Sequence, residues 1–520
     1  MQQRRTFAII SHPDAGKTTI TEKLLLFAGA IDVAGAVKGK KTEKKARSDW
    51  MEMEKSRGIS VSSSVMQFEY ANCIFNLLDT PGHEDFSEDT YRVLTAVDCA
   101  LMIIDGVKGV ESRTRKLMAI CRQRSIPVIT FINKFDRSAQ CPMTLLDEIE
   151  NELHLKCSPQ TWPIGSGKEF KGVYDFHSKI CKVYESGQNF IKQDPNQVLL
   201  NNLLDTIPDP FLKSDLQDQI ELYEETKEIN IESFHKGDLT PVYFGSALNN
   251  FGIKEVLSSF AQFAPQPQKF ELADNTFVSP EDQNFTAFVF KVQANMNPQH
   301  RDRVAFCRIC SGKYSMGQKL FHVSSGKFLQ NTQAVGFLGQ SRQRVEEALP
   351  GDIIGLINHG SISIGDSFSS KKINSLKFKG ISKFAPEIFK QVHLKDPLKS
   401  KQLNNGLTQL SQEGATQFFK MINSNNLILG AVGVLQFEVV QARLDSEYNL
   451  NCEFKPSTFV CAQWVDSDCD ESLNNLEKSH GHQLARDSGN DLVLLATSMI
   501  QIQMIQDKFP KIRFSSMKDF

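Results

Sequence analysis

The pattern of apolar and polar positions changes character along the chain. In the first half, short apolar runs alternate with segments in which apolar residues recur every three or four positions, as Ile20, Leu24 and Phe27 do. Buried strands that alternate with amphipathic helices are typical of a mostly parallel sheet with helices on both faces. The predicted strands cover residues 6–10, 73–78, 99–104, 127–132 and 241–244, and the predicted helices cover residues 17–27, 85–94 and 112–122.

The pattern divides the chain into three predicted domains, and the fold class is multidomain α/β. The first is an α/β domain over residues 1–270, with an insertion at about 137–240 where the periodicity loosens, and a proline-rich linker near its end. From residue 285 apolar positions recur with a period of two and turn residues are frequent, which predicts a β-barrel domain over residues 280–375. Mixed strands and helices predict an α+β domain over residues 385–520.

Composition narrows the functional classes. The formal net charge of −2 argues against a protein that coats nucleic acid through an overall basic field, and we expect no DNA partner. Eleven cysteines are too few for a disulfide scaffold and favour reduced thiols in a cytoplasmic protein. Cys307 and Cys310 form a single C-x-x-C pair, which supplies only half of the ligands of a structural zinc site. The apolar runs are shorter than the roughly 18 residues of a membrane span.

A candidate phosphate-binding segment follows the first predicted strand. It fits the G-x-x-x-x-G-K-[ST] pattern, except that a serine stands in place of the first glycine. Backbone N–H groups of such a loop cradle phosphate oxygens, while Lys17 would reach the β- and γ-phosphates and the hydroxyl of Thr18 would bind Mg²⁺. The alternative is an ordinary turn between a strand and a helix. The residues are Ser11, His12, Pro13, Asp14, Ala15, Gly16, Lys17 and Thr18.

A second group of polar residues ends the strand predicted at residues 73–78. Asp79 is placed to hold Mg²⁺ through a water molecule, and the backbone N–H of Gly82 is placed to contact a γ-phosphate. A turn built on Pro81 and Gly82 that binds no ligand is the alternative. The group comprises Asp79, Thr80, Pro81, Gly82 and His83.

Two further loops carry residues suited to guanine. The carboxylate of Asp136 can accept hydrogen bonds from the N1–H and the exocyclic amine of guanine, which adenine does not offer, and Lys134 can stack its stem on the ring. The loop after residues 241–244 can offer a backbone N–H to the guanine oxygen. Because all these loops follow successive strands, the sequence predicts a GTPase domain. The residues are Asn133, Lys134, Phe135 and Asp136 in the first loop and Ser246, Ala247 and Leu248 in the second.

The chain resembles the translational GTPases, which act on the ribosome. The segment from Asp79 to His83 resembles their D-T-P-G-H motif, and the segment from Arg57 to Ser60 resembles their R-G-I-T motif in switch I. A β-barrel second domain is also typical of this family. Within it, the chain is most similar to the class-II peptide chain release factors of bacteria. The stretches that carry this likeness are residues 48–54, 84–92, 293–296, 300–306 and 430–437.

The resemblance implies roles for individual residues. Thr18 and Ser60 would complete the coordination of Mg²⁺ when GTP is bound, and His83 would orient the attacking water once the ribosome positions it. In related factors two apolar residues flank this histidine, and those positions hold Pro13 and Ile59 in this chain. The implied cofactors are therefore GTP or GDP and Mg²⁺.

The resemblance also implies a function in translation termination. The protein would bind the post-termination ribosome through ribosomal RNA and proteins, promote the dissociation and recycling of class-I release factors, and leave after GTP hydrolysis. It would not hydrolyse peptidyl-tRNA itself, and it would act as a cytoplasmic monomer. Release of the γ-phosphate would free both switch loops and so report the nucleotide state.

Three other functions fit the residues less well. Another translational GTPase would carry different family stretches, and a ribosome-binding protein without useful hydrolysis would not need His83. A P-loop kinase or ATPase would not need the guanine-binding residues Asn133, Lys134 and Asp136. For the basic run at residues 38–45, contact with ribosomal RNA phosphates and a solvated loop both stay open.

Overall fold

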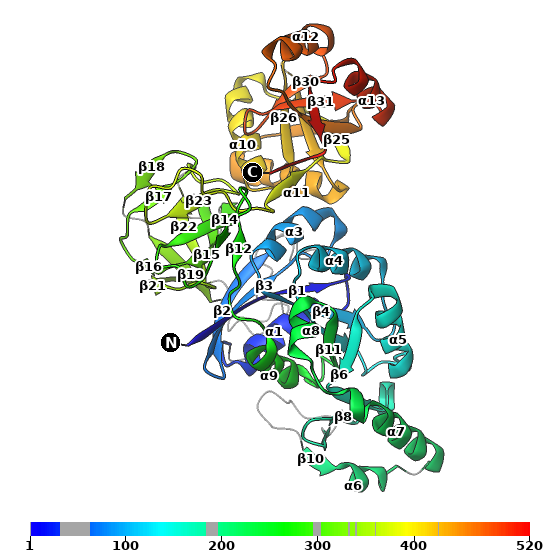
Figure 1. Cartoon of the computed structure of the whole chain (residues 1–520). Coiled ribbons are helices and arrows are strands. Elements are labelled where there is room, and N and C mark those ends of the chain that lie inside the picture. The colour runs from blue at the N-terminus through cyan, green and yellow to red at the C-terminus, as the bar shows by residue number, and fades with distance from the viewer. Residues whose placement is uncertain are drawn as a thin grey trace.

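The computed structural model describes residues 2–31, 63–183, 196–207, 209–294, 303–330, 333–338, 341–358, 360–424 and 426–519 (Figure 1). Two predicted features lie outside these ranges: the segment that resembles the switch I motif, with Ile59 and Ser60, and the basic run at residues 38–45. In the described part, a first domain with a mostly parallel sheet is followed by an antiparallel half-barrel and an α+β domain, which confirms the predicted fold class.

The first domain is built on a sheet with the strand order β2-β3-β1-β4-β5-β11-β6. Neighbouring strands are parallel except for β2, which pairs antiparallel with β3 at one edge. The strands are β1 (Gln3–Ser11), β2 (Ser64–Tyr70), β3 (Cys73–Asp79), β4 (Cys99–Asp105), β5 (Val128–Asn133), β6 (Lys156–Pro159) and β11 (Leu239–Phe244).

Helices cover both faces of this sheet, because alternate residues of a strand point to opposite sides. In β1, Phe7 and Ile9 join the core formed with α1, α8 and α9, whereas Ala8 and Ile10 join the core formed with α3, α4 and α5. The helices predicted at residues 17–27, 85–94 and 112–122 are confirmed, and a 3-10 turn, η1 (Glu84–Phe86), opens the second. They are α1 (Lys17–Phe27), α3 (Ser87–Thr95), α4 (Ser112–Gln123), α5 (Pro142–Leu153), α8 (Ile231–Lys236) and α9 (Ile253–Phe263).

A small antiparallel sheet with the order β10-β9-β8-β7 projects from the first domain, together with two helices (Figure 1). It lies within residues 137–240, where the sequence predicts an insertion. That range also contains α5 and β6, and β6 pairs with β11 in the main sheet. The projecting segment is therefore shorter than the region of loosened periodicity. Its elements are β7 (Thr161–Ile164), η2 (Gly167–Glu169), β8 (Gly172–Asp175), β9 (Ile180–Val183), β10 (Asn196–Leu199), α6 (Leu200–Leu204), α7 (Pro210–Tyr223) and η3 (Glu224–Thr226).

The second domain is an antiparallel half-barrel with the strand order β18-β17-β23-β14-β15-β22-β19-β20. Two short two-stranded sheets, β12-β13 and β16-β21, accompany it. The strands are β12 (Phe270–Glu271), β13 (Phe277–Val278), β14 (Thr286–Ala294), β15 (Arg303–Ser311), β16 (Tyr314–Ser315), β17 (Leu320–His322), β18 (Lys327–Leu329), β19 (Ala334–Leu338), β20 (Ser341–Arg344), β21 (Glu347–Ala348), β22 (Ile353–Asn358) and β23 (Ser367–Ser369).

The C-terminal domain has an antiparallel sheet with the order β28-β25-β27-β26-β30-β31-β29-β32, packed against helices. Its strands are β24 (Ser382–Phe384), β25 (Ile388–Leu394), β26 (Gln417–Met421), β27 (Leu427–Ala431), β28 (Cys452–Pro456), β29 (Cys461–Asp466), β30 (Leu484–Asp487), β31 (Leu492–Ala496), β32 (Arg513–Ser515) and β33 (Met517–Asp519). Its helices are η4 (Pro397–Lys399), α10 (Ser400–Gln412), α11 (Val434–Tyr448), α12 (Asp470–His480) and α13 (Met499–Lys508).

Buried polar contacts join the half-barrel to the first domain. The carbonyl oxygen of Gly351 accepts hydrogen bonds from Thr6 Oγ1 at 2.6 Å, Asn76 Nδ2 at 3.2 Å and Arg308 Nη1 at 2.8 Å. Nη2 of Arg308 also donates to the carboxylate of Asp98 at 2.6 Å, and neither of these two side chains is more than 1 % exposed. The charges are therefore paired away from water, between the two domains.

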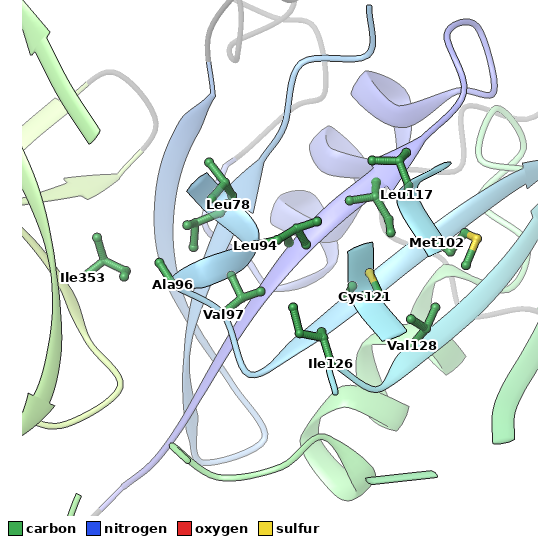
Figure 2. Packing of buried hydrophobic residues seen from close by; sticks show 14 of the residues in the cluster. Leu78, Leu94, Ala96, Val97, Met102, Leu117, Cys121, Ile126, Val128 and Ile353 are labelled. Atoms are coloured by element: carbon green, nitrogen blue, oxygen red, sulfur yellow. The ribbon is translucent and has the colours of Figure 1, made fainter. Parts of the chain in front are cut away.

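A hydrophobic cluster crosses the same boundary. In Figure 2, Ile353 at the start of β22 belongs to the cluster that includes Ala96 and Val97, which follow α3. Separating the two domains would expose this apolar surface, at a cost of roughly 25 cal/mol for each Å². The other labelled members are Leu78, Leu94, Met102, Leu117, Cys121, Ile126 and Val128.

Candidate functional site

A pocket of about 600 Å³ lies where the parallel strands of the first domain end. Ligands of open α/β sheets bind at this edge, outside the carboxyl ends of the strands. Three of the four predicted loops line the pocket. The fourth, after β3, is not part of the lining, and its Asp79 contacts Lys17, which is not part of it either. The lining residues are Asp14, Gly16, Thr19, Asp105, Val107, Lys108, Asn133, Lys134, Asp136, Arg137, Ala247 and Leu248.

The loop between β1 and α1 has the backbone geometry that a phosphate cradle needs. Asp14 and Gly16 have positive φ angles of 65° and 99°, and Gly16 directly precedes α1. A Cβ atom at Gly16 would lie 2.3 Å from Nδ2 of Asn133, so a larger residue would displace the loop. Within the described residues no side chain caps α1. The N–H groups of its first turn are therefore available to an anion.

The lysine of this loop is paired with the carboxylate at the end of β3. Nζ of Lys17 lies 2.5 Å from Oδ1 of Asp79, and the side chains are 7 % and 2 % exposed. Thr80 donates its hydroxyl to the carbonyl of Ile9 at 2.7 Å, which ties the end of β3 to β1. The hydroxyl-bearing residue Thr18, one position after Lys17, is partly buried. Of the two described residues of the predicted Mg²⁺ site, Thr18 follows Lys17 in the first turn of α1, and Asp79 contacts Lys17 from the end of β3.

His83 lies in the turn after β3, beside the phosphate loop. A Cβ atom at Gly82 would lie 3.8 Å from Cα of Pro13, so the two loops adjoin. The His83 side chain is 39 % exposed and caps η1, because its Nδ1 accepts a hydrogen bond from the N–H of Asp85 at 3.3 Å. The imidazole is thus held by its own turn and is still open to solvent.

Asn133 connects the phosphate loop to the loop after β11. Its Nδ2 donates to the carbonyl of Ala15 at 2.8 Å, and its Oδ1 accepts from the N–H of Ala247 at 2.9 Å. The side chain is 3 % exposed, so both bonds are shielded from water. The next apolar residue, Phe135, is buried against Phe244. Asn133 therefore sets the distance between two loops that both line the pocket.

Asp136 is held by the loop after β11. The hydroxyl of Ser246 donates to Oδ1 of Asp136 at 2.5 Å, and the N–H of Asn249 donates to the same hydroxyl oxygen at 3.2 Å. Of the three residues predicted to offer an N–H to guanine, Ser246 and Ala247 already donate theirs, to Phe251 and Asn133. Within the described residues, the N–H of Leu248 has no protein partner, and this residue is 68 % exposed.

Asp105 and Glu111 are site residues that the motifs do not reveal. Nζ of Lys134 lies 2.7 Å from Oδ2 of Asp105, whose side chain is 3 % exposed at the end of β4. Nε2 of His12 lies 3.0 Å from Oε2 of Glu111, which directly precedes α4. Both carboxylates follow the strand predicted at residues 99–104. A search for polar residues after every predicted strand, without a motif, would have found them.

The described residues contain no group of three or more His, Cys, Asp and Glu side chains that could hold a metal ion by themselves. Mg²⁺ in nucleotide sites is held mainly by phosphates and water, with one or two protein oxygens. Thr18 and Asp79 offer such oxygens. The residues present therefore fit Mg²⁺ when a bound nucleotide supplies the remaining ligands.

Three family models match the chain. The model of the elongation factor Tu GTP binding domain matches residues 2–266, that of elongation factor G domain 2 matches residues 284–371, and that of the class II release factor RF3, C-terminal domain, matches residues 378–506. The first covers half of the chain, and the chain therefore belongs to the translational GTPases. The match of the C-terminal model assigns it, within that family, to the release factor 3 type.

A solved structure supports the fold assignment. A crystal structure of a protein from Thermus thermophilus is similar with a TM-score of 0.70 and 21 % sequence identity, over 94 % of this chain and 72 % of that chain. At this identity the likeness concerns the fold alone. The family models add that the chain is a GTPase that binds guanine nucleotide, interacts with the ribosome and belongs to translation termination. No helix in the described ranges is long and apolar enough to cross a membrane.

Proposed function

We propose that this protein is a GTPase that the ribosome stimulates and that promotes the dissociation and recycling of class-I release factors from the post-termination ribosome. The observation that carries the proposal is the position of Asn133, which holds a phosphate loop and a guanine loop around one pocket in a chain with a release factor C-terminal domain. We further propose that it acts as a monomer and binds no DNA.

In this proposal the base is read at one end of the pocket. The carboxylate of Asp136 accepts the N1–H and the exocyclic amine of guanine, and the hydroxyl of Ser246 keeps that carboxylate in place. The N–H of Leu248 donates to the guanine oxygen, because the N–H groups of its two neighbours are used within the protein. Lys134 lies along the ring, anchored by Asp105.

The phosphates occupy the other end. Lys17 would exchange its contact with Asp79 for the β- and γ-phosphates, and Asp79, through water, and the hydroxyl of Thr18 would hold Mg²⁺. Ser60, outside the described residues, provides the second hydroxyl in the GTP state. When bound, Mg²⁺ would neutralise part of the negative charge of the phosphates.

His83 orients the attacking water in the hydrolysis step. The water oxygen forms a bond to the γ-phosphorus as the bond to the bridging oxygen breaks, which gives GDP and phosphate. Phosphoryl transfer depends mainly on positioning and charge neutralisation, so a poorly oriented water keeps the reaction slow. Stimulation by the ribosome follows if docking moves His83, which is held on η1 in the free protein.

A release assay tests the proposal. Post-termination ribosomes that carry a fluorescent class-I release factor are mixed with the protein and GTP, GDP or no nucleotide, and loss of the label is followed in time. We expect acceleration with GTP, and slow turnover of the protein on ribosomes with His83→Ala. Ribosome-stimulated GTP hydrolysis without faster loss of the label would contradict the recycling function while leaving the GTPase assignment intact.

A further inference from the structure

Helix α11 of the C-terminal domain begins at a glycine that its own backbone does not require. Gly433, the residue before α11, has φ −138° and ψ 166°, an extended conformation open to any residue. Ser, Thr, Asp or Asn at this position would cap the helix with their own side chain. A Cβ atom at Gly433 would instead lie 1.9 Å from Cγ of Asp85. The space of the missing side chain is taken by a carboxyl group from the GTPase domain.

Asp85 supplies the cap that Gly433 lacks. Its Oδ2 accepts a hydrogen bond from the N–H of Leu435, in the first turn of α11, at 2.7 Å. The side chain of Gln436 binds two backbone N–H groups just before the helix. Its Oε1 accepts from the N–H of Val432 at 2.8 Å and from that of Gly433 at 3.2 Å. A carboxylate at a helix N-terminus is also favoured by the helix dipole. The first turn of α11 is thus completed from another domain.

The same aspartate holds His83. Two groups of Asp85 lie 3.3 Å from Nδ1 of His83: its N–H, which donates to an unprotonated Nδ1, and its Oδ1, which accepts in the tautomer that carries a proton on Nδ1. One carboxyl group therefore contacts the proposed water-orienting side chain through one oxygen and the C-terminal domain through the other. We propose that Asp85 is a positioning residue that holds His83 in a resting orientation for as long as α11 is docked on it. This inference rests on the role proposed above for His83.

Neighbouring contacts make the docking of α11 depend on the position of the whole C-terminal domain. Tyr91 of α3 packs edge to face against Phe384 of β24, with ring centroids 4.7 Å apart. Arg92, 2 % exposed, fills the space beside Gly414, where a Cβ atom would lie 2.4 Å from its Nη2. Both residues lie on α3, which directly follows η1, the turn that carries Asp85. Figure 1 shows α3 next to α11. A shift of the C-terminal domain would withdraw α11 and free Asp85 together with His83.

Four variants separate this coupling from helix stability. Asp85→Ala removes the cap, and Gly433→Ala expels the Asp85 carboxyl group by steric clash. Asp85→Ala combined with Gly433→Ser returns a cap to α11 from the residue that precedes the helix, but does not restore the link between domains. Ser498→Ala is the matched control, because Ser498 caps α13 in the same domain by accepting from the N–H of Gln501 at 3.2 Å.

Two measurements on the full-length protein test the proposal. The first is the imidazole NMR signal of His83, assigned by its loss in His83→Gln. The second is single-turnover GTP hydrolysis without ribosomes. We expect Asp85→Ala and Gly433→Ala to shift the His83 signal. Both should also raise the ribosome-free rate by about fivefold, because loss of a contact equal to one helix cap raises the fraction of protein with α11 undocked by that factor. The double variant should recover thermal stability but keep the raised rate, and Ser498→Ala should change neither signal nor rate.

An unshifted His83 signal in both single variants, or an equal shift in Ser498→Ala, would overturn the coupling. So would recovery of the slow rate in the double variant, because that would trace the effect to helix stability. Failure of the His83 role itself has a different signature. In that case His83→Ala would keep full ribosome-stimulated hydrolysis, while the NMR shift caused by Gly433→Ala would still occur.

Discussion

Asn133→Ala is the substitution that the site geometry ties most directly to nucleotide binding. It removes the donor to Ala15 and the acceptor for Ala247, both in a site where Asn133 is 3 % exposed. A buried backbone group left without a partner costs about 1–3 kcal/mol, so two such groups cost about 3 kcal/mol if water satisfies part of the loss. Part of that cost falls on the alignment of the phosphate and guanine loops.

The misalignment of the two loops should appear as a higher dissociation constant for the nucleotide. The full cost of about 3 kcal/mol would weaken binding about a hundredfold, which is therefore the upper limit of the expected effect. GDP and GTP should weaken equally, since neither loop contact involves the γ-phosphate. Titration with fluorescent GDP and GTP analogues measures the two dissociation constants, and urea unfolding measures the stability.

Asn76→Ala provides the matched control. Asn76 is also buried and also donates to a backbone carbonyl, that of Gly351, but it lies at the boundary with the half-barrel. It should lower the free energy of unfolding and leave nucleotide affinity unchanged. If Asn133→Ala weakens nucleotide binding no more than Asn76→Ala does, the reasoning that Asn133 aligns the two loops is wrong.

Three further substitutions test other contacts. Asp136→Asn should shift preference from guanine to xanthine nucleotides in a competition assay, and unchanged GTP affinity would refute the assigned base contact. Lys17→Ala should weaken triphosphate binding by several kcal/mol through loss of a charge-assisted contact, and an unchanged dissociation constant would exclude a phosphate role. Arg308→Met should lower the free energy of unfolding by about 3–5 kcal/mol, because it leaves a buried carboxylate unpaired. Burial already raises the pKa of Asp98, so this deficit should shrink as the pH falls and Asp98 takes up a proton; a pH-independent deficit would argue against an unpaired charge.

The sequence predicts the loops of the site well because each motif is local and each follows a strand. The predicted helix at residues 17–27 has the bounds of α1, and the phosphate loop lies between it and β1. Parallel strands bring successive loops to one edge, so Asp136 and Ser246 meet although 110 residues separate them. The roles of these residues in binding and hydrolysis stay predictions.

Contacts between domains could not be predicted in the same way. The bond from Leu435 to Asp85 joins residues 350 positions apart and depends on how the C-terminal domain docks, which no local pattern encodes. The short strand β6 falls within the predicted insertion because its four residues are mixed in polarity, and only its pairing with β11 places it in the main sheet. Asp105 belongs to no motif, and its contact with Lys134 becomes visible only once β4 and β5 are paired.

The contact of Thr6 with Gly351 has a consequence for the thermodynamics of unfolding. Thr6 lies in β1, the strand that runs on to Ser11 and into the phosphate loop, so one strand is shared between the boundary with the half-barrel and the pocket. All residues that line the pocket belong to the first domain. A ligand that binds only the native state stabilises every part that unfolds with its site. Guanine nucleotide should therefore raise the melting temperature of the half-barrel without touching it, and the two domains should melt in a single calorimetric transition.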